Sequence, residues 1–318
     1  MQSPAHVMRD VIPVADYDGD AAVYVADLGT VVRRYLQFLD ALPRVTPYFA
    51  VKCNPDPAVV HLLALLGASF DCASSDEISL VASTGIADLD ARIIYANPCK
   101  QPSQLKHAAE LGVTLMTFDS DDELLKIRDL HPTARLMLRI AVEDSHALCP
   151  LSSKYGANMD DVPDLLRTAN VLGLNVVGVA FHVGSGCTDV TSYTAALIRA
   201  RKVFHDAERL GMTPLSILDI GGGFPGHDAE APVTFLEIAR TLHRDLDSMF
   251  DKSIRVIAEP GRYFVSAAFS LAAKVLSCRK NEIGPSAVVI GDGVYGSFKD
   301  AVLLNISFST ARQHCDIG

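Results

Sequence analysis

Lys52 ends the apolar segment YFAVK, and a Pro-containing break follows it. An ammonium group at the end of a buried strand must find a partner or lose its charge. A lysine with a depressed pKa is a nucleophile that can form a Schiff base with a carbonyl group. The alternative is a lysine whose stem lies on apolar surface while its charge reaches water. The position thus predicts either a Schiff-base lysine or an ordinary surface lysine.

Three successive glycines, Gly221, Gly222 and Gly223, follow another apolar segment in LDIGGGFPG. Glycines leave backbone N–H groups uncovered, and such groups can bind a phosphate. A flexible turn is the other interpretation.

Glu259 and Arg262 follow a further apolar segment in AEPGRYF. One interpretation is a structural ion pair between the two side chains. The other is that both contact a cofactor, with Glu259 paired to its protonated ring nitrogen and Arg262 bound to its phosphate.

His182 ends an apolar segment in FHVGSG, and Ser185 follows in the Gly-rich turn. Either His182 is a core histidine with satisfied hydrogen bonds, or its imidazole stacks on a flat aromatic cofactor while Ser185 binds phosphate. Arg139 and Asp71 are charged residues at the ends of apolar segments, and each needs a partner, a ligand or water.

Short apolar, β-branched segments alternate with amphipathic helical segments along most of the chain. The expected strands are 48–52, 69–74, 92–98, 113–119, 134–140, 176–183, 217–221 and 255–260, and the helical patterns include 57–67, 76–84, 101–112, 161–173, 191–211 and 232–249. This alternation predicts an α/β fold with a parallel sheet. The number of units favours a TIM (β/α)8 barrel over an open doubly wound sheet, and the polar residues above would then share its carboxyl-terminal rim.

Two segments fall outside this pattern. Residues 21–28 contain a strand-like piece, and residues 263–309 are expected to be rich in β-strands, with the segments YFVSAAFSLAAKVLSC, AVVIGDGVYGSF and AVLLNISFS. We expect a barrel over 29–266 and a second, incomplete all-β domain made from both chain ends, 1–28 and 267–318.

Composition narrows the functional classes. The 318 residues carry a net charge of -10 with no run of Lys or Arg, which argues against nucleic acid or an anionic membrane as a partner. Seven scattered cysteines without a CxxC pair argue against a metal site and against a disulfide framework. The sequence shows no signal peptide and no apolar run of membrane-spanning length, so we expect a cytoplasmic protein.

Long collinear motifs resemble the eukaryotic-type ornithine decarboxylases, enzymes of the alanine-racemase-like fold that depend on pyridoxal 5'-phosphate (PLP). The motifs are YFAVKCN, FDCASSDEI, RIIYANPCKQ, MTFDSDDEL, LRIAVEDS, FHVGSGCTD, LDIGGGFPG, AEPGRYFV and GDGVYGSF. The resemblance implies that this is a group IV decarboxylase that converts L-ornithine to putrescine and CO2 for polyamine biosynthesis, acting as a homodimer.

The resemblance also implies a role for each matching residue. Lys52 would bind the cofactor's aldehyde, His182 would stack on its ring, and Glu259 would pair with its nitrogen. The implied phosphate ligands are Ser185, Gly222 and Arg262 with the backbone around Gly221, Gly223 and Gly261. The other implied pocket residues are Asp71, Glu77 and Arg139. Tyr295 matches a tyrosine at the family's subunit boundary.

The C-terminal part departs from the family pattern, in which the β-domain continues well beyond the VYGSF motif. Leu303 and Leu304 stand where the family has an aspartate that binds the distal amine of the substrate. Cys315 and Asp316 resemble the family's Cys-Asp pair, which crosses to the partner's site, but lie closer to Tyr295. The chain thus resembles a C-terminally shortened family member, as a fragment, a shortened gene or a natural variant would.

Two alternatives remain open at this point. One is a catalytically silent homologue that regulates by binding antizyme, whose binding region in the family corresponds to residues 100–126, with Lys100, Lys106 and Lys126. The other is a decarboxylase of another basic amino acid, namely lysine, arginine or diaminopimelate.

Overall fold

The computed structural model describes residues 21–228, 231–279 and 287–299. Contacts within the chain divide it into two compact units. The larger unit is Leu28–Ala268, and the smaller combines Met1–Asp27 with Phe269–Gly318.

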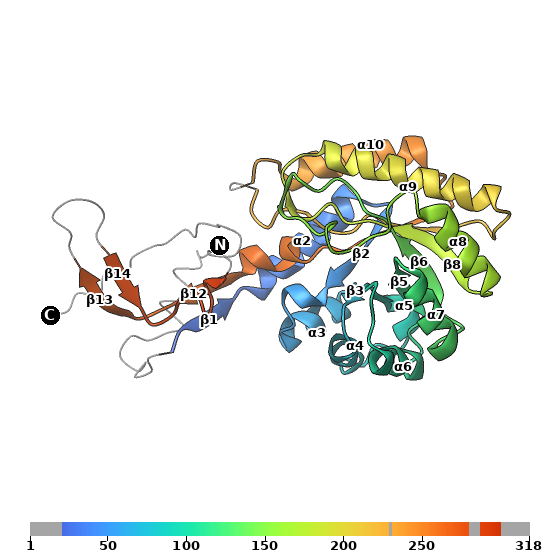
Figure 1. Cartoon of the computed structure of the whole chain (residues 1–318). Helices are drawn as coiled ribbons and strands as arrows, with labels where there is room; N and C mark the ends of the chain where they lie inside the picture. The colour runs from blue at the N-terminus through green and yellow to red at the C-terminus, as the bar shows by residue number, and fades with distance from the viewer. Residues whose placement is uncertain (1–20, 229–230, 280–286, 300–318) are drawn as a thin grey trace. The chain divides into compact units, whose positions relative to one another are not determined.

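The larger unit is a closed barrel of eight parallel strands (Figure 1). In order along the chain the strands are β2 (Val45–Ala50), β3 (Ser69–Cys72), β4 (Ile93–Tyr95), β5 (Leu115–Phe118), β6 (Arg135–Arg139), β8 (Asn175–Ala180), β10 (Ile217–Asp219) and β11 (Arg255–Ala258). β11 pairs with β2 and closes the barrel, with Val256 beside Val45. The predicted TIM-type barrel is confirmed, and each of its strands overlaps a segment predicted to be a strand.

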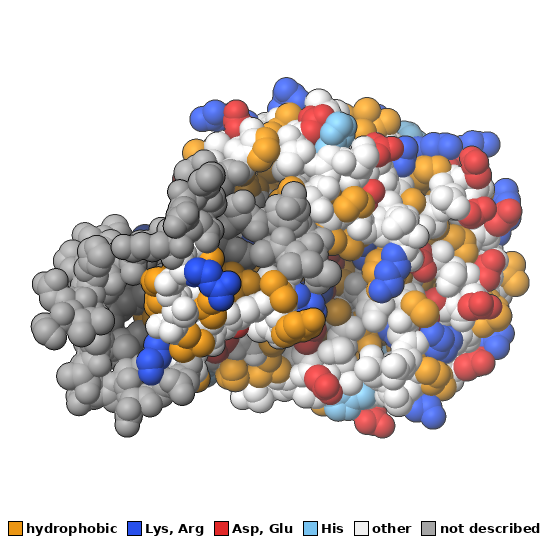
Figure 2. All heavy atoms as spheres, turned by 60° about the vertical axis from the view of Figure 1, so that its left-hand side comes forward, with side chains coloured by type: hydrophobic (Ala, Val, Ile, Leu, Met, Phe, Trp, Pro, Cys, Tyr) orange, Lys and Arg blue, Asp and Glu red, His pale blue; other side chains and the backbone are white. Residues whose placement is uncertain are grey.

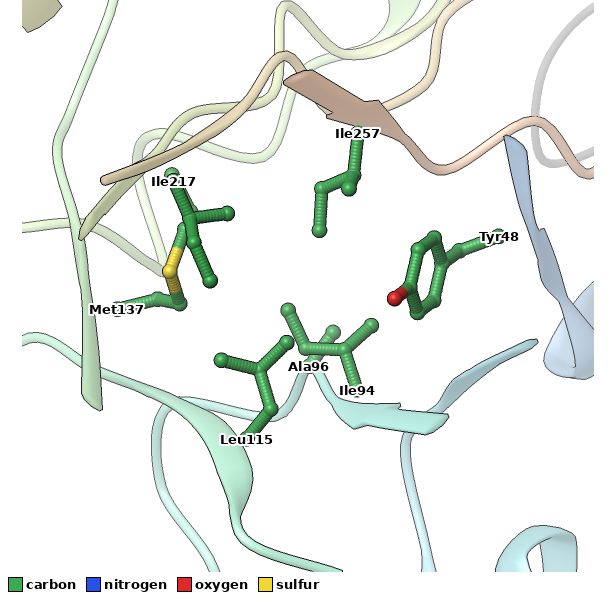
Figure 3. Close-up of a cluster of buried hydrophobic side chains, with 8 residues drawn as sticks. Tyr48, Ile94, Ala96, Leu115, Met137, Ile217 and Ile257 are labelled. Atoms are coloured by element: carbon green, nitrogen blue, oxygen red, sulfur yellow. The ribbon is translucent and has the colours of Figure 1, made fainter. Parts of the chain in front are cut away.

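These segments form strands because their β-branched and aromatic side chains are buried on both faces, as parallel strands require. One set of these side chains fills the inside of the barrel (Figure 3). The buried cluster comprises Tyr48, Ile94, Ala96, Leu115, Met137, Ala180, Ile217 and Ile257. Since they come from β2, β4, β5, β6, β8, β10 and β11, with Ala96 directly after β4, the cluster ties these strands to one another, and the barrel is a packed core rather than a channel.

Helices surround the barrel, as Figure 1 shows. They are α2 (Leu28–Ala41), α3 (Pro57–Leu65), α4 (Ser75–Ala82), α5 (Leu89–Arg92), α6 (Pro102–Glu110), α7 (Asp121–Leu130), α8 (Val162–Val171), α9 (Thr191–Arg209), α10 (Phe235–Met249) and α11 (Arg262–Val265). Local sequence fixes their ends: Ser74 and Ser120 cap α4 and α7 through their hydroxyls, and Thr234 forms a capping box with Glu237 in α10.

Short elements complete the rim of the barrel. The 3-10 turns are η1 (Val51–Cys53) and η2 (Ser266–Ala268), and an antiparallel pair outside the barrel joins β7 (Ala147–Cys149) to β9 (Ser185–Cys187). The prediction of β-structure from residue 263 is wrong for its first part, because α11 and η2 occupy 262–268. Tyr263 and Phe264 are fully buried there, and both pack against Phe38 of α2.

The smaller unit contains antiparallel strands from both ends of the chain, as predicted. β1 (Val23–Ala26) pairs with β12 (Phe269–Ala272), so that Val23 lies opposite Ala272. β13 (Val275–Arg279) pairs with β14 (Ala287–Ile290).

Acidic and basic side chains are interspersed over most of the described surface that Figure 2 presents. In the described ranges no helix is both long and apolar enough to cross a bilayer.

Candidate active site

The polar residues singled out from the sequence lie at the carboxyl ends of the barrel strands or in the loops that follow them. Lys52 is in η1 after β2, Asp71 in β3, Glu77 in the first turn of α4, Arg139 at the end of β6, and His182 after β8. The remaining positions follow on neighbouring elements: Ser185 in β9, Gly221–Gly223 after β10, Glu259 after β11, and Gly261 and Arg262 at the start of α11. The barrel therefore brings them to one rim.

Lys52 forms an ion pair with Asp71. Its Nζ donates to Asp71 Oδ2 at 2.5 Å, and the Asp71 side chain is completely buried while 47% of the Lys52 side chain is accessible at the open rim. Asp71 Oδ1 is buried without a hydrogen-bond partner in the described residues. One oxygen of this carboxylate is thus committed to Lys52 and the other remains available.

Of the two outcomes that the sequence left open for the Lys52 ammonium, the structure shows a partner rather than a depressed pKa. Desolvation lowers the pKa, but the carboxylates of Asp71 and Glu259 outweigh that effect and raise the pKa above its ordinary value. The positive charge of Lys52 is thus stabilised by carboxylates and is not lost. Lys52 is therefore an ammonium group held in place by carboxylates.

A second acidic centre lies at the ends of β10 and β11. Glu259 and Asp219 are both buried. Burial raises the pKa of Glu259 well above its ordinary value, with further increases from Asp219 and Asp71. Burial likewise raises the pKa of Asp219. Asp219 was not among the site residues expected from the sequence, although, like Asp71, it is a charged residue at the carboxyl end of an apolar strand.

His182 is held as a neutral imidazole. Its Nδ1 accepts a hydrogen bond from the N–H of Gly184 at 2.9 Å, which leaves the proton of the neutral ring on Nε2. Burial lowers the pKa of His182 well below its ordinary value, and the positive charges of Arg139 and Lys52 lower it further. A neutral, fixed ring can cover the face of a flat ligand.

The glycine loop after β10 presents donors without side chains. The N–H of Gly221 donates to Asp219 Oδ1, whereas those of Gly222 and Gly223 make no hydrogen bond within the described residues. The loop is fixed from outside: Tyr193 donates to the carbonyl of Gly222 at 3.0 Å. A Cβ on Gly222 would lie 2.7 Å from the carbonyl oxygen of Glu259, so no side chain fits. This loop can accept an anion on its free N–H groups.

Arg262 and Ser185 face each other beside this loop. An Nη of Arg262 lies 3.5 Å from the Ser185 hydroxyl, a long hydrogen bond, and Arg262 Nε is buried without a partner in the described residues. A guanidinium with unused buried donors is suited to a phosphate group.

The other pocket residues line the same rim. The Glu77 carboxylate accepts from the N–H of Ala73 at 2.7 Å, and the Arg139 guanidinium lies 5.2 Å from the centre of the Tyr155 ring. A Cβ on Gly261 would lie 2.8 Å from that of Cys53, so the start of α11 packs directly against the turn that carries Lys52.

Three predicted positions lie outside the larger unit. Tyr295 belongs to the smaller unit and its side chain is exposed. Cys315 and Asp316, like Leu303 and Leu304, lie outside the described residues.

The lysines of the segment 100–126 differ in accessibility. Lys100 is buried, with its Nζ 2.8 Å from the Glu123 carboxylate and 2.7 Å from the carbonyl oxygen of Thr117. Lys126 Nζ binds the same Glu123 at 2.5 Å. Lys106 is exposed on α6. Of these three, Lys106 presents the most accessible charge.

The chemistry of the rim fits PLP group by group. Free N–H groups and Arg262 match a phosphate, the buried acid pair matches a ring nitrogen, neutral His182 matches a flat ring, and Lys52 is the amine for an aldehyde. Within the described part of the chain, no group of three or more His, Cys, Asp or Glu side chains could hold a metal ion.

Comparisons with known proteins point to the same chemistry. Residues 28–266 match the family described as "Pyridoxal-dependent decarboxylase, pyridoxal binding domain". The chain is 49% identical over 305 residues to antizyme inhibitor 2 of Xenopus laevis, covering 92% of this chain and 65% of the relative. It is 47% identical over 300 residues to ornithine decarboxylase of Mus musculus, covering 90% and 64%. The chain thus spans slightly less than two thirds of these relatives.

A solved structure agrees over nearly the whole chain. The arginine decarboxylase of Paramecium bursaria Chlorella virus superposes with a TM-score of 0.91 at 32% identity, covering 98% of this chain and 82% of that protein. Both the barrel and the antiparallel strands therefore have counterparts in a decarboxylase.

Proposed function

Because this chain belongs to the family of pyridoxal-dependent decarboxylases, we propose that it binds PLP at the barrel rim and decarboxylates a basic amino acid, L-ornithine, to putrescine and CO2. The observation that carries the proposal is the placement of Lys52 on the same rim as the donors of Gly222 and Gly223 and the buried Glu259. Each of the three matches a different group of one cofactor.

The residues divide the work of this reaction. The bound cofactor would supply the electron sink for the electrons left on Cα when CO2 departs. Glu259 would hold a proton at the ring nitrogen, and neutral His182 would cover the ring without adding charge. The Lys52 Nζ must lose its proton before it can act as a nucleophile, and Asp71 Oδ2, at 2.5 Å, is the acceptor within reach.

Ornithine is proposed as the substrate because the ornithine decarboxylase of Mus musculus is 47% identical to this chain, whereas the viral arginine decarboxylase is 32% identical to it. The site itself supports an α-amino acid of either kind, since Lys52, Glu259 and the glycine loop act on groups common to both. Lysine, arginine and diaminopimelate remain the alternatives to be tested beside it. The homodimer, the cytoplasmic location and the roles of Tyr295, Cys315 and Asp316 stay predictions.

The test combines absorbance with product release. The chain with PLP is expected to show the visible absorbance of PLP bound to an amine and to release CO2 from ornithine faster than from lysine or arginine. Lys52→Ala should lose both signals, while Lys106→Ala, an exposed lysine on α6, should keep both. If the unmodified chain showed no visible absorbance, or if Lys52→Ala kept it, the proposed function would be wrong.

A second candidate is regulation by binding antizyme, favoured by the 49% identity to an antizyme inhibitor. The burial of Lys100 reduces the exposed charge in the segment 100–126. The absorbance and CO2 assay, combined with a binding experiment on immobilised antizyme, separates the decarboxylase from the regulator. Bound PLP without CO2 release from any basic amino acid, together with retention of the chain on antizyme, would favour the regulator.

A further inference from the structure

We propose that Asp219 is a positioning residue which forms, with Glu259, a carboxyl pair that retains a proton at the end of the site where the ring nitrogen would lie. The inference rests on the proposed function for the orientation of Glu259 toward that nitrogen. The proton sharing itself is a property of the cofactor-free chain.

The backbone brings the two carboxyl groups together. Asp219 is the last residue of β10 and lies beside Ile257 of β11. The ladder between the strands continues beyond them, because Ile220 N–H donates to Ile257 and Glu259 N–H donates to Gly221 at 2.7 Å. Glu259 is therefore held two residues beyond Ile257, the partner of Asp219, directly after the end of the neighbouring strand β11.

Asp219 is fully buried, and its two oxygens have different surroundings. Oδ1 accepts from the N–H of Gly221 at 2.8 Å. Oδ2 is buried and makes no hydrogen bond of ordinary geometry within the described residues. Glu259 is the neighbouring buried carboxyl group, and its side chain lowers a pKa of Asp219 that burial otherwise raises. A proton held between the two carboxyl groups would give the buried Oδ2 of Asp219 a hydrogen bond.

The charges around the pair favour retention of one proton. Asp71 on β3 and Arg139 on β6 act on both Asp219 and Glu259, and Lys52 in η1 acts on Glu259. His182, after β8, is neutral because its pKa lies well below the ordinary value. Three carboxyl groups therefore face two cations, and a single proton balances the charge. Two ionised carboxylates in this buried position would repel each other strongly.

The pair has a signature in the pH dependence of stability. Burial raises the pKa of Asp219 to about 7, against an ordinary value near 4. A carboxyl with a raised pKa in the folded protein contributes stability that is complete below its unfolded pKa and is lost as pH rises through its folded pKa. One such proton increases the unfolding constant by about 50-fold between pH 5 and pH 7.

The experiment compares Asp219→Asn with the unmodified chain, both without PLP, by urea unfolding from pH 5 to pH 8. The ratio of the two unfolding constants, unmodified over variant, is expected to rise about 50-fold between pH 5 and pH 7. Asp245→Asn is the matched control. Asp245 is also buried, in α10, but hydrogen bonds from Arg244 and Thr194 outweigh burial and lower its pKa, so its ratio should stay constant across this window.

A constant ratio for Asp219→Asn from pH 5 to pH 8 would overturn the proposal. If that variant failed to fold, Glu259→Gln would take its place, since its amide can donate to the Asp219 carboxylate and keep it ionised. The unfolding constant of Glu259→Gln should then depend less on pH in the same window, and an unchanged dependence would equally exclude the pair.

PLP titration separates this inference from the proposed function. Asp219→Asn is expected to keep covalent binding at Lys52 while its affinity for PLP changes with pH differently from that of the unmodified chain. Absence of the visible absorbance in the unmodified chain would refute the function and leave the carboxyl pair intact. A normal absorbance with no pH effect of Asp219→Asn on either unfolding or affinity would refute the pair alone.

Discussion

At the scale of single residues, an added methyl group at Gly222 has a direct consequence for the phosphate-binding loop. In Gly222→Ala the Cβ would lie 2.7 Å from the Glu259 carbonyl oxygen and 2.9 Å from His182 Nε2, so the loop or its neighbours must move. We expect a destabilisation of about 1–3 kcal/mol from overpacking and a loss of at least tenfold in PLP affinity. Urea unfolding and absorbance titration measure the two effects.

Gly211→Ala is the control for that variant. Gly211 has a positive φ of 68° at the end of α9, and a Cβ there would meet no atom within 4 Å. Gly211→Ala should lower the stability of the chain through backbone strain and leave its PLP affinity unchanged. Equal PLP affinity of Gly222→Ala and the unmodified chain would contradict the role of the glycine loop.

Most of the rim residues could be proposed from the sequence because they stand out locally, as charged or glycine residues directly after apolar segments. Lys52 and Glu259 are examples. The pKa of Lys52 could not be deduced in this way, since it depends on Asp71, a residue of another strand. Asp219 was missed because its neighbour Glu259 comes 40 residues later in the chain and meets it only through the pairing of β10 with β11.

At the scale of elements, the barrel strands were predictable because each is a short, almost entirely apolar segment bounded by breaks. The ends of several helices were also visible: Gly67 and Gly112 follow α3 and α6 with φ of 89° and 74°, the conformation that glycine adopts most readily. Residues 263–268 were not predictable from composition. Their aromatic and β-branched side chains favour a strand, but packing of Tyr263 and Phe264 against α2 outweighs this local preference.

The loop between β4 and α6 depends on a buried charge. Lys100→Met should destabilise the chain by about 3 kcal/mol or more, because the buried carboxylate of Glu123 keeps only Lys126 as an ionic partner. Urea unfolding at neutral pH measures this loss. Lys106→Met, an exposed lysine on the next helix, should change stability by less than about 0.5 kcal/mol. A similar small change for Lys100→Met would show that the buried ion pair is dispensable.

At the scale of the whole molecule, the barrel and the antiparallel strands are separate compact units, and all the rim residues that match groups of PLP belong to the barrel. This division could be expected from the sequence because the alternation of strands and helices ends near residue 266.

Ligand binding should therefore stabilise the barrel as a unit. PLP at a hundred times its dissociation constant is expected to raise the unfolding free energy by about 2.7 kcal/mol, since it binds the folded chain and not the unfolded one. Urea unfolding with and without PLP measures the increase, and pyridoxal without the phosphate serves as the control for the glycine loop. An equal effect of the two compounds would contradict phosphate binding by that loop.

The hydrogen bond from Glu259 N–H to the Gly221 carbonyl joins, through main-chain atoms alone, the part of the rim suited to an anion and the part suited to a basic nitrogen. The separation between these two parts is consequently set by peptide geometry and is independent of side-chain identity. Molecules whose anionic and basic ends are spaced differently could satisfy only one of them. Substitutions elsewhere on the barrel rim can thus change which amino acid binds. The length of the prosthetic group that fits the rim stays the same.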